Sequence, residues 1–150
     1  MGKDRVMTRQ ISAADTIPLR HEVLRPGKPR ETAIFAGDEL PTTTHWGAFA
    51  PDGSLVAVAT LMRSSQPGTT SMAWQVRGMA CTPNARGQGF GSAVLQAVAS
   101  YVAEQEPRAL IWCNARVSAL GFYRAHGFET VGPEFDSPGI GPHFVMTRTA

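Results

Sequence analysis

The stretch CTPNARGQGFGSAVLQAV, residues 81–98, decides how this chain folds. It places three glycines, Gly87, Gly89 and Gly91, within five positions and then continues directly into an apolar pattern of helical period. Glycine loses more backbone freedom on folding than any other residue, so this density is costly where a helix must begin. The first N–H groups of a helix and the positive end of its dipole attract anions. We therefore predict an anion site here, with a tight strand-to-helix turn that holds no ligand as the alternative.

The segments on both sides of this turn indicate strands and helices in a mixed order. Residues 72–81 before it predict a strand, and residues 89–104 predict a helix with its apolar side chains on one face. Upstream, we expect a strand at 5–12, a helix at 15–27 that stops at Pro26-Gly27, and a hairpin at 44–64. Downstream, we expect a buried strand at 108–113, a helix at 117–128 ended by Gly127, and strands at 128–132 and 143–148.

This order of elements predicts one α/β domain over residues 1–150, with a mixed, mostly antiparallel central sheet flanked by helices. A chain of 150 residues is of ordinary domain size and buries enough surface to need neither disulfide nor metal. Hydrophobic content of 43% and charged content of 17% are typical of a globular protein.

The composition also predicts which partners and compartments to exclude. No apolar run approaches the roughly 20 residues that span a bilayer, and residues 1–10 lack the apolar stretch of a secretory signal. Cys81 and Cys113 have no metal-ligand spacing and are expected to be free thiols in a reducing cytoplasm. A net charge of only +2 argues against a general nucleic-acid binder. We expect a cytoplasmic protein without a metal, a membrane partner or a nucleic-acid partner.

The charge distribution supports an anionic ligand. Residues 53–103 contain no Asp or Glu but hold Arg63, Arg77 and Arg86. Two common phosphate sites do not fit. A Walker loop needs a Lys after its glycines, and here Ser92 follows Gly91. A dinucleotide site needs a third glycine where Ser92 stands and an acid after the next strand, where residues 110–114 carry none.

Two motifs resemble those of the GNAT acetyltransferase family. RGQGFG, residues 86–91, resembles the family's R/Q-x-x-G-x-G/A motif, which holds the pyrophosphate of acetyl-coenzyme A. ALGFYRAHGF, residues 119–128, resembles its A-x-x-[LF]-Y-x-x-x-G-F segment, and GIGPHFVM, residues 139–146, is similar to the ending of some small members. The resemblance covers about residues 74–148, and the order of the preceding elements agrees with it.

The resemblance implies an N-acetyltransferase that moves an acetyl group from acetyl-CoA to an amine of a small molecule or peptide. Transfer would be direct, in a ternary complex. It further implies a kinked fourth strand whose main chain pairs with the pantetheine arm and donates to the oxyanion. The implied cofactor-binding residues are Met79, Ala80 and Cys81 on this strand and Arg86, Gly87, Gln88, Gly89, Phe90 and Gly91 in the turn.

Tyr123 matches the family tyrosine that protonates or hydrogen-bonds the departing sulfur. The ordinary pKa of a tyrosine, ~10, exceeds the ~8.5 of a thiol, so we expect Tyr123 mainly to donate a hydrogen bond. A core aromatic is its alternative role, and for Phe122 that role is preferred. The commoner family pattern has an Asn where Arg116 stands; Asn114 is then either a ligand of the pantetheine amides or a helix cap.

The acceptor side carries weaker signals. His143 is the first candidate for the general base, because imidazole titrates near neutrality; a hydrogen-bonded strand histidine is the alternative. Arg25 is either a ligand for an acceptor carboxylate or a cation at a helix C-terminus. Glu22, Asp38 and His45 lie in the first half, where the resemblance implies the acceptor pocket, and each by itself is expected to be a surface residue.

Three alternatives remain at this point. A non-catalytic acyl-CoA-binding or sensing module would keep the glycine turn, and the presence of Tyr123 argues against it. A covalent acyl-enzyme on Cys81 is disfavoured, because a thiol on a buried strand without an adjacent His is a poor nucleophile. A homodimer is compatible with a chain of this size, and no segment predicts its interface.

Overall fold

The computed structural model describes residues 6–150 and contains one seven-stranded sheet with the order β1-β2-β3-β4-β5-β7-β6. All neighbouring strands are antiparallel except β4 and β5, which are parallel, so the predicted mixed sheet is confirmed. Residue 5, where the first strand was expected to begin, lies outside the described residues. The strands are β1 (Met7–Ile11), β2 (Thr44–Phe49), β3 (Leu55–Arg63), β4 (Trp74–Cys81), β5 (Leu110–Arg116), β6 (Glu129–Ser137) and β7 (Gly141–Thr149).

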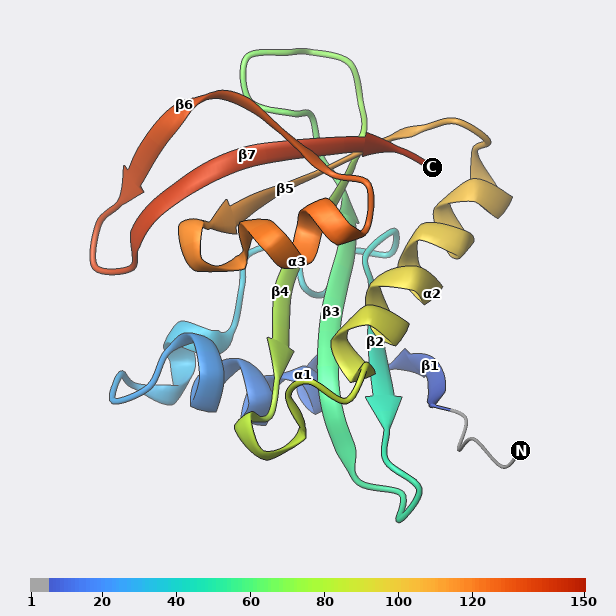
Figure 1. Ribbon diagram of the computed structural model, residues 1–150, viewed down its shortest axis with the longest axis vertical. Helices are drawn as coiled ribbons and strands as arrows, with labels where there is room; N and C mark the ends of the chain where they lie inside the picture. Colours follow the sequence, from blue (N-terminus) through green and yellow to red (C-terminus); the bar gives the residue numbers. More distant parts are fainter. Residues whose placement is uncertain (1–5) are drawn as a thin grey trace.

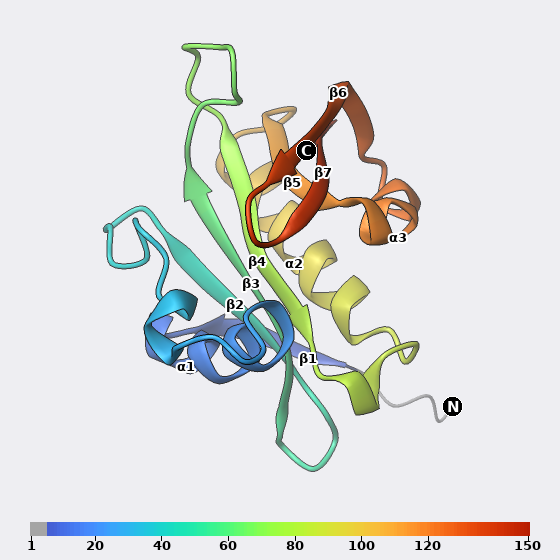
Figure 2. The same cartoon turned by 90° about the vertical axis from the view of Figure 1, so that its left-hand side faces the viewer.

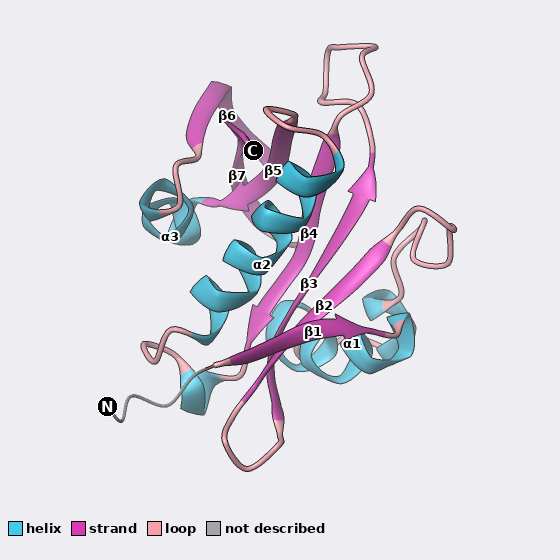
Figure 3. Cartoon of the chain, turned by 90° about the vertical axis from the view of Figure 1, so that its right-hand side faces the viewer, coloured by secondary structure: helices cyan, strands magenta, loops and turns pink. Residues whose placement is uncertain are grey.

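Helices cover both faces of this sheet (Figure 2). The α-helices are α1 (Ala13–Leu19), α2 (Phe90–Gln105) and α3 (Leu120–Ala125), with single turns at η1 (Arg20–Leu24), η2 (Arg30–Ala33), η3 (Pro83–Ala85) and η4 (Val117–Ala119). Figure 3 shows α2 lying along one face and α1 on the other. Within residues 6–150, none of the helices is long and apolar enough to cross a membrane.

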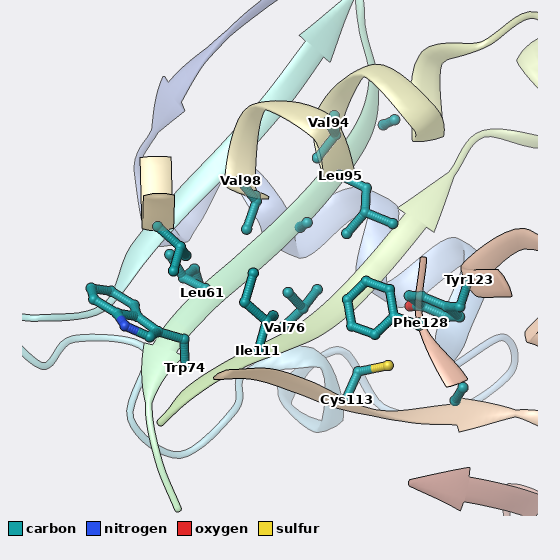
Figure 4. Close-up of a cluster of buried hydrophobic side chains, with 14 of the residues drawn as sticks. Leu61, Trp74, Val76, Val94, Leu95, Val98, Ile111, Cys113, Tyr123 and Phe128 are labelled. Atoms are coloured by element: carbon teal, nitrogen blue, oxygen red, sulfur yellow. The ribbon is translucent and has the colours of Figure 1, made fainter. Parts of the chain in front are cut away.

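Residues 57–61 of β3 face the two sides of the sheet alternately, which explains the layers. Ala57, Ala59 and Leu61 belong to the large cluster beneath α2, whereas Val58 packs with Leu19 of α1. Figure 4 shows α2 contributing Val94, Leu95 and Val98 to the large cluster, opposite Leu61, Val76 and Ile111. The helical face predicted from the spacing of apolar residues is the face that is buried: Phe90, Val94, Leu95, Val98 and Val102.

The predicted helix at 15–27 is divided into two geometries. α1 begins at a capping box, in which the Ser12 hydroxyl accepts from the Asp15 N–H and the Asp15 carboxylate accepts from the Ser12 N–H. From Arg20 the chain continues as the wider π turn η1, and the Arg25 N–H reaches the Arg20 carbonyl. The segment ends before Pro26-Gly27, as the sequence predicted.

Two irregularities of β4 open the sheet. Thr60 of β3 pairs with Arg77 and Val58 with Ala80, so Gly78 and Met79 bulge opposite a single residue. Gly78 has φ +65°, a left-handed conformation that side chains rarely adopt. β4 pairs with β5 only at Trp74 and Gln75, and the two strands then diverge (Figure 1). The kinked fourth strand is therefore confirmed, and it opens toward β5.

Candidate active site

A cleft of about 1020 Å³ lies where β4 and β5 diverge. The glycine turn lines it, and so do both strands and the start of β7. Gln88 is the predicted site residue that does not line this cleft: its side-chain amide donates to the Asn84 carbonyl and lines a second, smaller cavity. The predicted residues that do line it are Met79, Ala80, Cys81, Arg86, Gly87, Gly89, Phe90, Gly91, Asn114, Tyr123 and His143.

The glycine turn presents bare backbone to the cleft. Gly87 and Gly89 have φ +79° and +87°, and a Cβ added to either would meet nothing within 4 Å. Gly89 is the N-cap of α2, whose first backbone bond runs from the Ala93 N–H to the Gly89 carbonyl, so the N–H groups before Ala93 have no acceptor in a preceding turn. No acid lies in the first turn. Gly91 differs from these two glycines. Its backbone is not left-handed, and a Cβ added to it would contact the Phe122 ring at 3.5 Å.

Tyr123 is buried between the core and the cleft, with only 6% of its surface exposed. Figure 4 places it beside Phe128, and the two rings meet edge to face at 5.5 Å. Burial raises the pKa of Tyr123 well above its ordinary value, and the nearby Cys113 raises it further. The hydroxyl therefore stays protonated at neutral pH and is available as a hydrogen-bond donor.

Asn114 lies within β5, is exposed, and lines the cleft. The alternative that it caps a helix is wrong. The N-cap positions of η4 and α3 are Arg116 and Ala119, and neither helix has a side-chain cap bond. Arg116 instead reaches across the cleft, where its Nη2 donates to the Leu24 carbonyl at 3.1 Å.

His143 is held in one orientation on β7. Its Nδ1 lies 2.8 Å from the Gly141 carbonyl oxygen, which can only accept, so Nδ1 carries a hydrogen. The ring stacks on Phe135 at 5.6 Å, and only 7% of the residue is exposed. In the uncharged ring the lone pair is then on Nε2, as a base facing the cleft would require.

The expectation that Asp38 and His45 are surface residues is wrong. Arg20, fully buried, donates from Nη1 and Nη2 to the two carboxylate oxygens of Asp38 at 2.6 and 3.0 Å. It also donates to the Ala33 carbonyl and the Thr60 hydroxyl. His45 bridges the Thr60 hydroxyl and the Asp38 carbonyl. We call these five residues the Arg20 cluster; none of them lines the cleft.

The position of Arg20 in the sequence is a signal for this cluster. Arg20 lies three and four positions before Val23 and Leu24, on the apolar face of the predicted helix. A charge on an apolar face needs a buried partner. Glu22, by contrast, is exposed as expected and lines the smaller cavity.

Burial raises the pKa of the Cys81 thiol, and the positive charge of Arg86 lowers it by a smaller amount. The thiol form therefore dominates, which disfavours Cys81 as a nucleophile. Within residues 6–150, no group of three or more His, Cys, Asp or Glu side chains is arranged to hold a metal ion.

Comparisons with known proteins identify the family. The profile of the Acetyltransferase (GNAT) domain matches residues 35–149. Over 142 residues the chain is 37% identical to the uncharacterized N-acetyltransferase YitI of Bacillus subtilis, covering 94% of each protein.

Solved structures share the fold at low sequence identity. Escherichia coli ElaA superposes with a TM-score of 0.76 at 17% identity, covering 96% of this chain and 99% of that one. An aminoglycoside 6'-N-acetyltransferase complexed with coenzyme A gives 0.71 at 15% identity, covering 95% and 96%. GNAT acetyltransferases use acetyl-CoA and acylate amines. The family profile and the similarity to YitI show that this chain is an acyltransferase that belongs to the GNAT acetyltransferase family.

Proposed function

We propose that this chain transfers the acetyl group of acetyl-CoA to an amine of a small molecule or peptide by direct attack in a ternary complex. The observation that carries the proposal is the continuity of the cleft. One cavity joins the glycine turn, the bulge of β4, Tyr123 and His143, so donor and acceptor have room to meet in it. Such juxtaposition supplies much of the rate enhancement of a two-substrate reaction.

The glycine turn is suited to the pyrophosphate of acetyl-CoA, whose thioester supplies the acyl group. No atom lies within 4 Å of a Cβ added at Gly87 or Gly89, so a ligand can approach the backbone there. The first N–H groups of α2 have no acceptor within the helix, and Arg86 adds a positive charge to the cleft. These are the features that bind phosphate at a helix N-terminus.

The main chain of β4 is suited to the rest of the donor. Because β4 pairs with β5 only at Trp74 and Gln75, residues 76–81 have no strand partner on that side. Met79, Ala80 and Cys81 all line the cleft there. An extended arm with amide groups would bind such an edge as an added strand does. A backbone N–H in this position is also a preorganised donor to the negative charge that develops on the acyl oxygen.

Tyr123 and His143 are assigned the two proton-related roles. Tyr123 donates a hydrogen bond to the departing sulfur, and its raised pKa supports donation in place of full proton transfer. His143 accepts the proton of the attacking amine at Nε2, because Nδ1 is engaged by the Gly141 carbonyl. Asn114, exposed in the same cleft, contributes an amide to the pantetheine arm.

We also propose a cytoplasmic location, supported by the two free thiols of Cys81 and Cys113. A homodimer stays a prediction from chain size.

Two substitutions at Gly89 test the donor site. Asn and Asp both tolerate a left-handed conformation and both are good N-cap residues, so Gly89→Asn and Gly89→Asp should fold equally well. They differ by one negative charge beside the expected pyrophosphate. Calorimetric titration with acetyl-CoA should show binding by the wild type and an affinity at least about tenfold lower for Gly89→Asp than for Gly89→Asn, which corresponds to about 1.4 kcal/mol.

Equal affinities of the two variants would place the pyrophosphate elsewhere. If the folded wild type did not bind acetyl-CoA, the proposal would fail altogether. Binding without thiol release in a broad amine screen would favour the non-catalytic acyl-CoA-binding module.

A further inference from the structure

One end of the cleft is strongly cationic. Arg25 follows η1, Arg77 lies in the middle of β4, and Arg116 ends β5; all three are half-buried and line the cleft that His143 also lines. We call this part, with Phe35, the acceptor end. Within residues 6–150, the lining of the cleft contains no Asp or Glu.

The three guanidinium groups are held near one another by shared partners. Arg25 Nη1 and Arg116 Nη2 donate to the same Leu24 carbonyl oxygen, at 3.0 and 3.1 Å. Arg25 and Arg77 both lie over the Phe35 ring, with Cζ at 5.3 and 4.8 Å from its centroid. Arg25 therefore links the other two, and the positive charge is concentrated in one place.

None of these three arginines forms an ion pair with a carboxylate of the described residues. The ion pairs found within residues 6–150 are Arg20–Asp38 and Arg63–Glu106. Burial and the charge of Arg20 lower the pKa of Arg77, and Asp38 opposes them only in part. Both oxygens of Asp38 already accept from Arg20, and one also accepts from the Phe35 N–H. Burial lowers the pKa of Arg25, and repulsion by Arg116 and Arg20 lowers it further. A cluster of this kind is stabilised by a bound anion.

The pyrophosphate of the donor is not that anion if it binds at the glycine turn. Side chains alternate between the two faces of a strand, and Val76 packs into the core beneath α2. Arg77, the next residue, therefore points to the opposite face, where its Nη1 donates to the Ala36 carbonyl. The start of α2 and Arg86 lie on the face of β4 opposite the Arg77 guanidinium.

We infer that the acceptor is a small amine that also carries a carboxylate, with Arg25, Arg77 and Arg116 binding the carboxylate. The inference rests on the proposed function, because it describes the substrate of the same site. Guanidinium groups bind carboxylates through paired, charge-assisted hydrogen bonds. Arg116 and His143 are direct register partners on β5 and β7, and such partners have Cβ atoms about 5 Å apart. The carboxylate and the reacting amine therefore belong to one compact molecule, as in an amino acid.

The experiment measures thiol release from acetyl-CoA with matched acceptors. Each amino acid is compared with its carboxamide, and phosphoethanolamine and spermidine are added as a phosphate-bearing and a purely cationic amine. Acetyl-CoA binding is titrated in the same preparation. We expect turnover of at least one amino acid at a kcat/KM about tenfold or more above that of its amide, since the amide loses charge-assisted hydrogen bonds.

Arginine variants identify the residues. Arg25→Gln and Arg116→Gln should raise KM for the amino acid by about tenfold or more and raise KM for its amide by much less, because the amide accepts only neutral-type hydrogen bonds. The affinity for acetyl-CoA should also be unchanged. Arg9→Gln is the control, because it removes the same charge from an exposed position on β1, at the edge of the sheet.

The possible failures are distinguishable. Equal or better turnover of amides or spermidine would overturn the inference and leave the acetyltransferase proposal intact. Preference for phosphoethanolamine would replace the carboxylate by a phosphate. Acetyl-CoA binding with no turnover of any acceptor in the panel would count against the inference, whereas absent acetyl-CoA binding would overturn the proposed function itself.

Discussion

Tyr123 illustrates how a single residue acquires a role from its surroundings. A tyrosine in an aromatic-rich segment is equally suited to the core or to a site, and the structure places it at the boundary of the two. Its raised pKa makes it a weaker acid than tyrosine in water, so a hydrogen bond to the departing sulfur is its best-supported contribution.

We predict that Tyr123→Phe lowers kcat by roughly 10- to 100-fold, the effect of losing one hydrogen bond to a charged acceptor, without changing the affinity for acetyl-CoA. Steady-state kinetics with a working acceptor and calorimetry with acetyl-CoA measure the two quantities. The chain offers a matched control in Tyr101→Phe, which removes a hydroxyl from a ring packed on Trp46 and Trp74, away from the cleft. Equal turnover by both variants would exclude Tyr123 from the reaction.

The bulge of β4 determines the site at the scale of an element. Three features coincide at Gly78: a left-handed backbone, a bulge in the β3–β4 ladder, and the guanidinium of Arg20 close behind it. A Cβ added to Gly78 would lie 2.9 Å from Arg20 Nε and 3.3 Å from the Phe35 ring. The glycine thus allows the strand to bend against a buried charge.

We predict that Gly78→Ala lowers the free energy of unfolding more than Gly53→Ala does, by about 1–3 kcal/mol, the range for overpacking a filled site. Gly53 is the matched control because it also has a left-handed backbone, φ +90°, but nothing within 4 Å of an added Cβ. Urea unfolding of the two variants gives the difference. Gly78→Ala should also weaken acetyl-CoA binding, since residues 79–81 follow the bulge. Equal destabilisation would mean that the backbone conformation alone matters.

At the scale of the whole molecule, local patterns were predictable and long-range partnerships were not. The buried face of α2, the hairpin of β2 and β3 and the stop at Gly127 each follow from a short window of sequence, and the structure confirms them. The insertion of β7 between β5 and β6 depends on pairing between strands far apart in sequence, as does the early divergence of β4 from β5. Arg20 bonds Asp38, 18 positions away, and Thr60, 40 positions away. Its place on an apolar helix face indicates a buried partner, but no short window of sequence identifies which residue that partner is.

The Arg20 cluster connects the segment that forms the acceptor end to the sheet. Arg20 lies in η1, Ala33 in η2, Asp38 in the loop before β2, and Thr60 in β3. Within the described residues, Arg20 Nε is the buried side-chain nitrogen that has no hydrogen-bond partner. The other nitrogens of its guanidinium group donate to the neutral Ala33 carbonyl and Thr60 hydroxyl and to the Asp38 carboxylate, so Asp38 supplies the compensating charge and the stability of the whole fold should depend on its being ionised.

We predict that Asp38→Asn lowers the free energy of unfolding by about 3–5 kcal/mol at neutral pH, because it leaves the buried Arg20 charge unpaired. Burial alone would raise the pKa of Asp38, but hydrogen bonds from Arg20 and the Phe35 N–H outweigh it and hold the pKa below its ordinary value. A carboxylate with a lowered pKa stabilises the fold above the unfolded pKa of about 4, and this contribution is lost as the pH falls through the folded value. The difference between wild type and variant should therefore be largest at neutral pH and shrink below about pH 4, in urea unfolding measured across that range.

Glu104→Gln, which removes an exposed carboxylate from α2, should show no such difference at any pH. A difference for Asp38→Asn that stayed constant down to acidic pH would mean that shape, and not the charge of Asp38, holds residues 20–38 on the sheet.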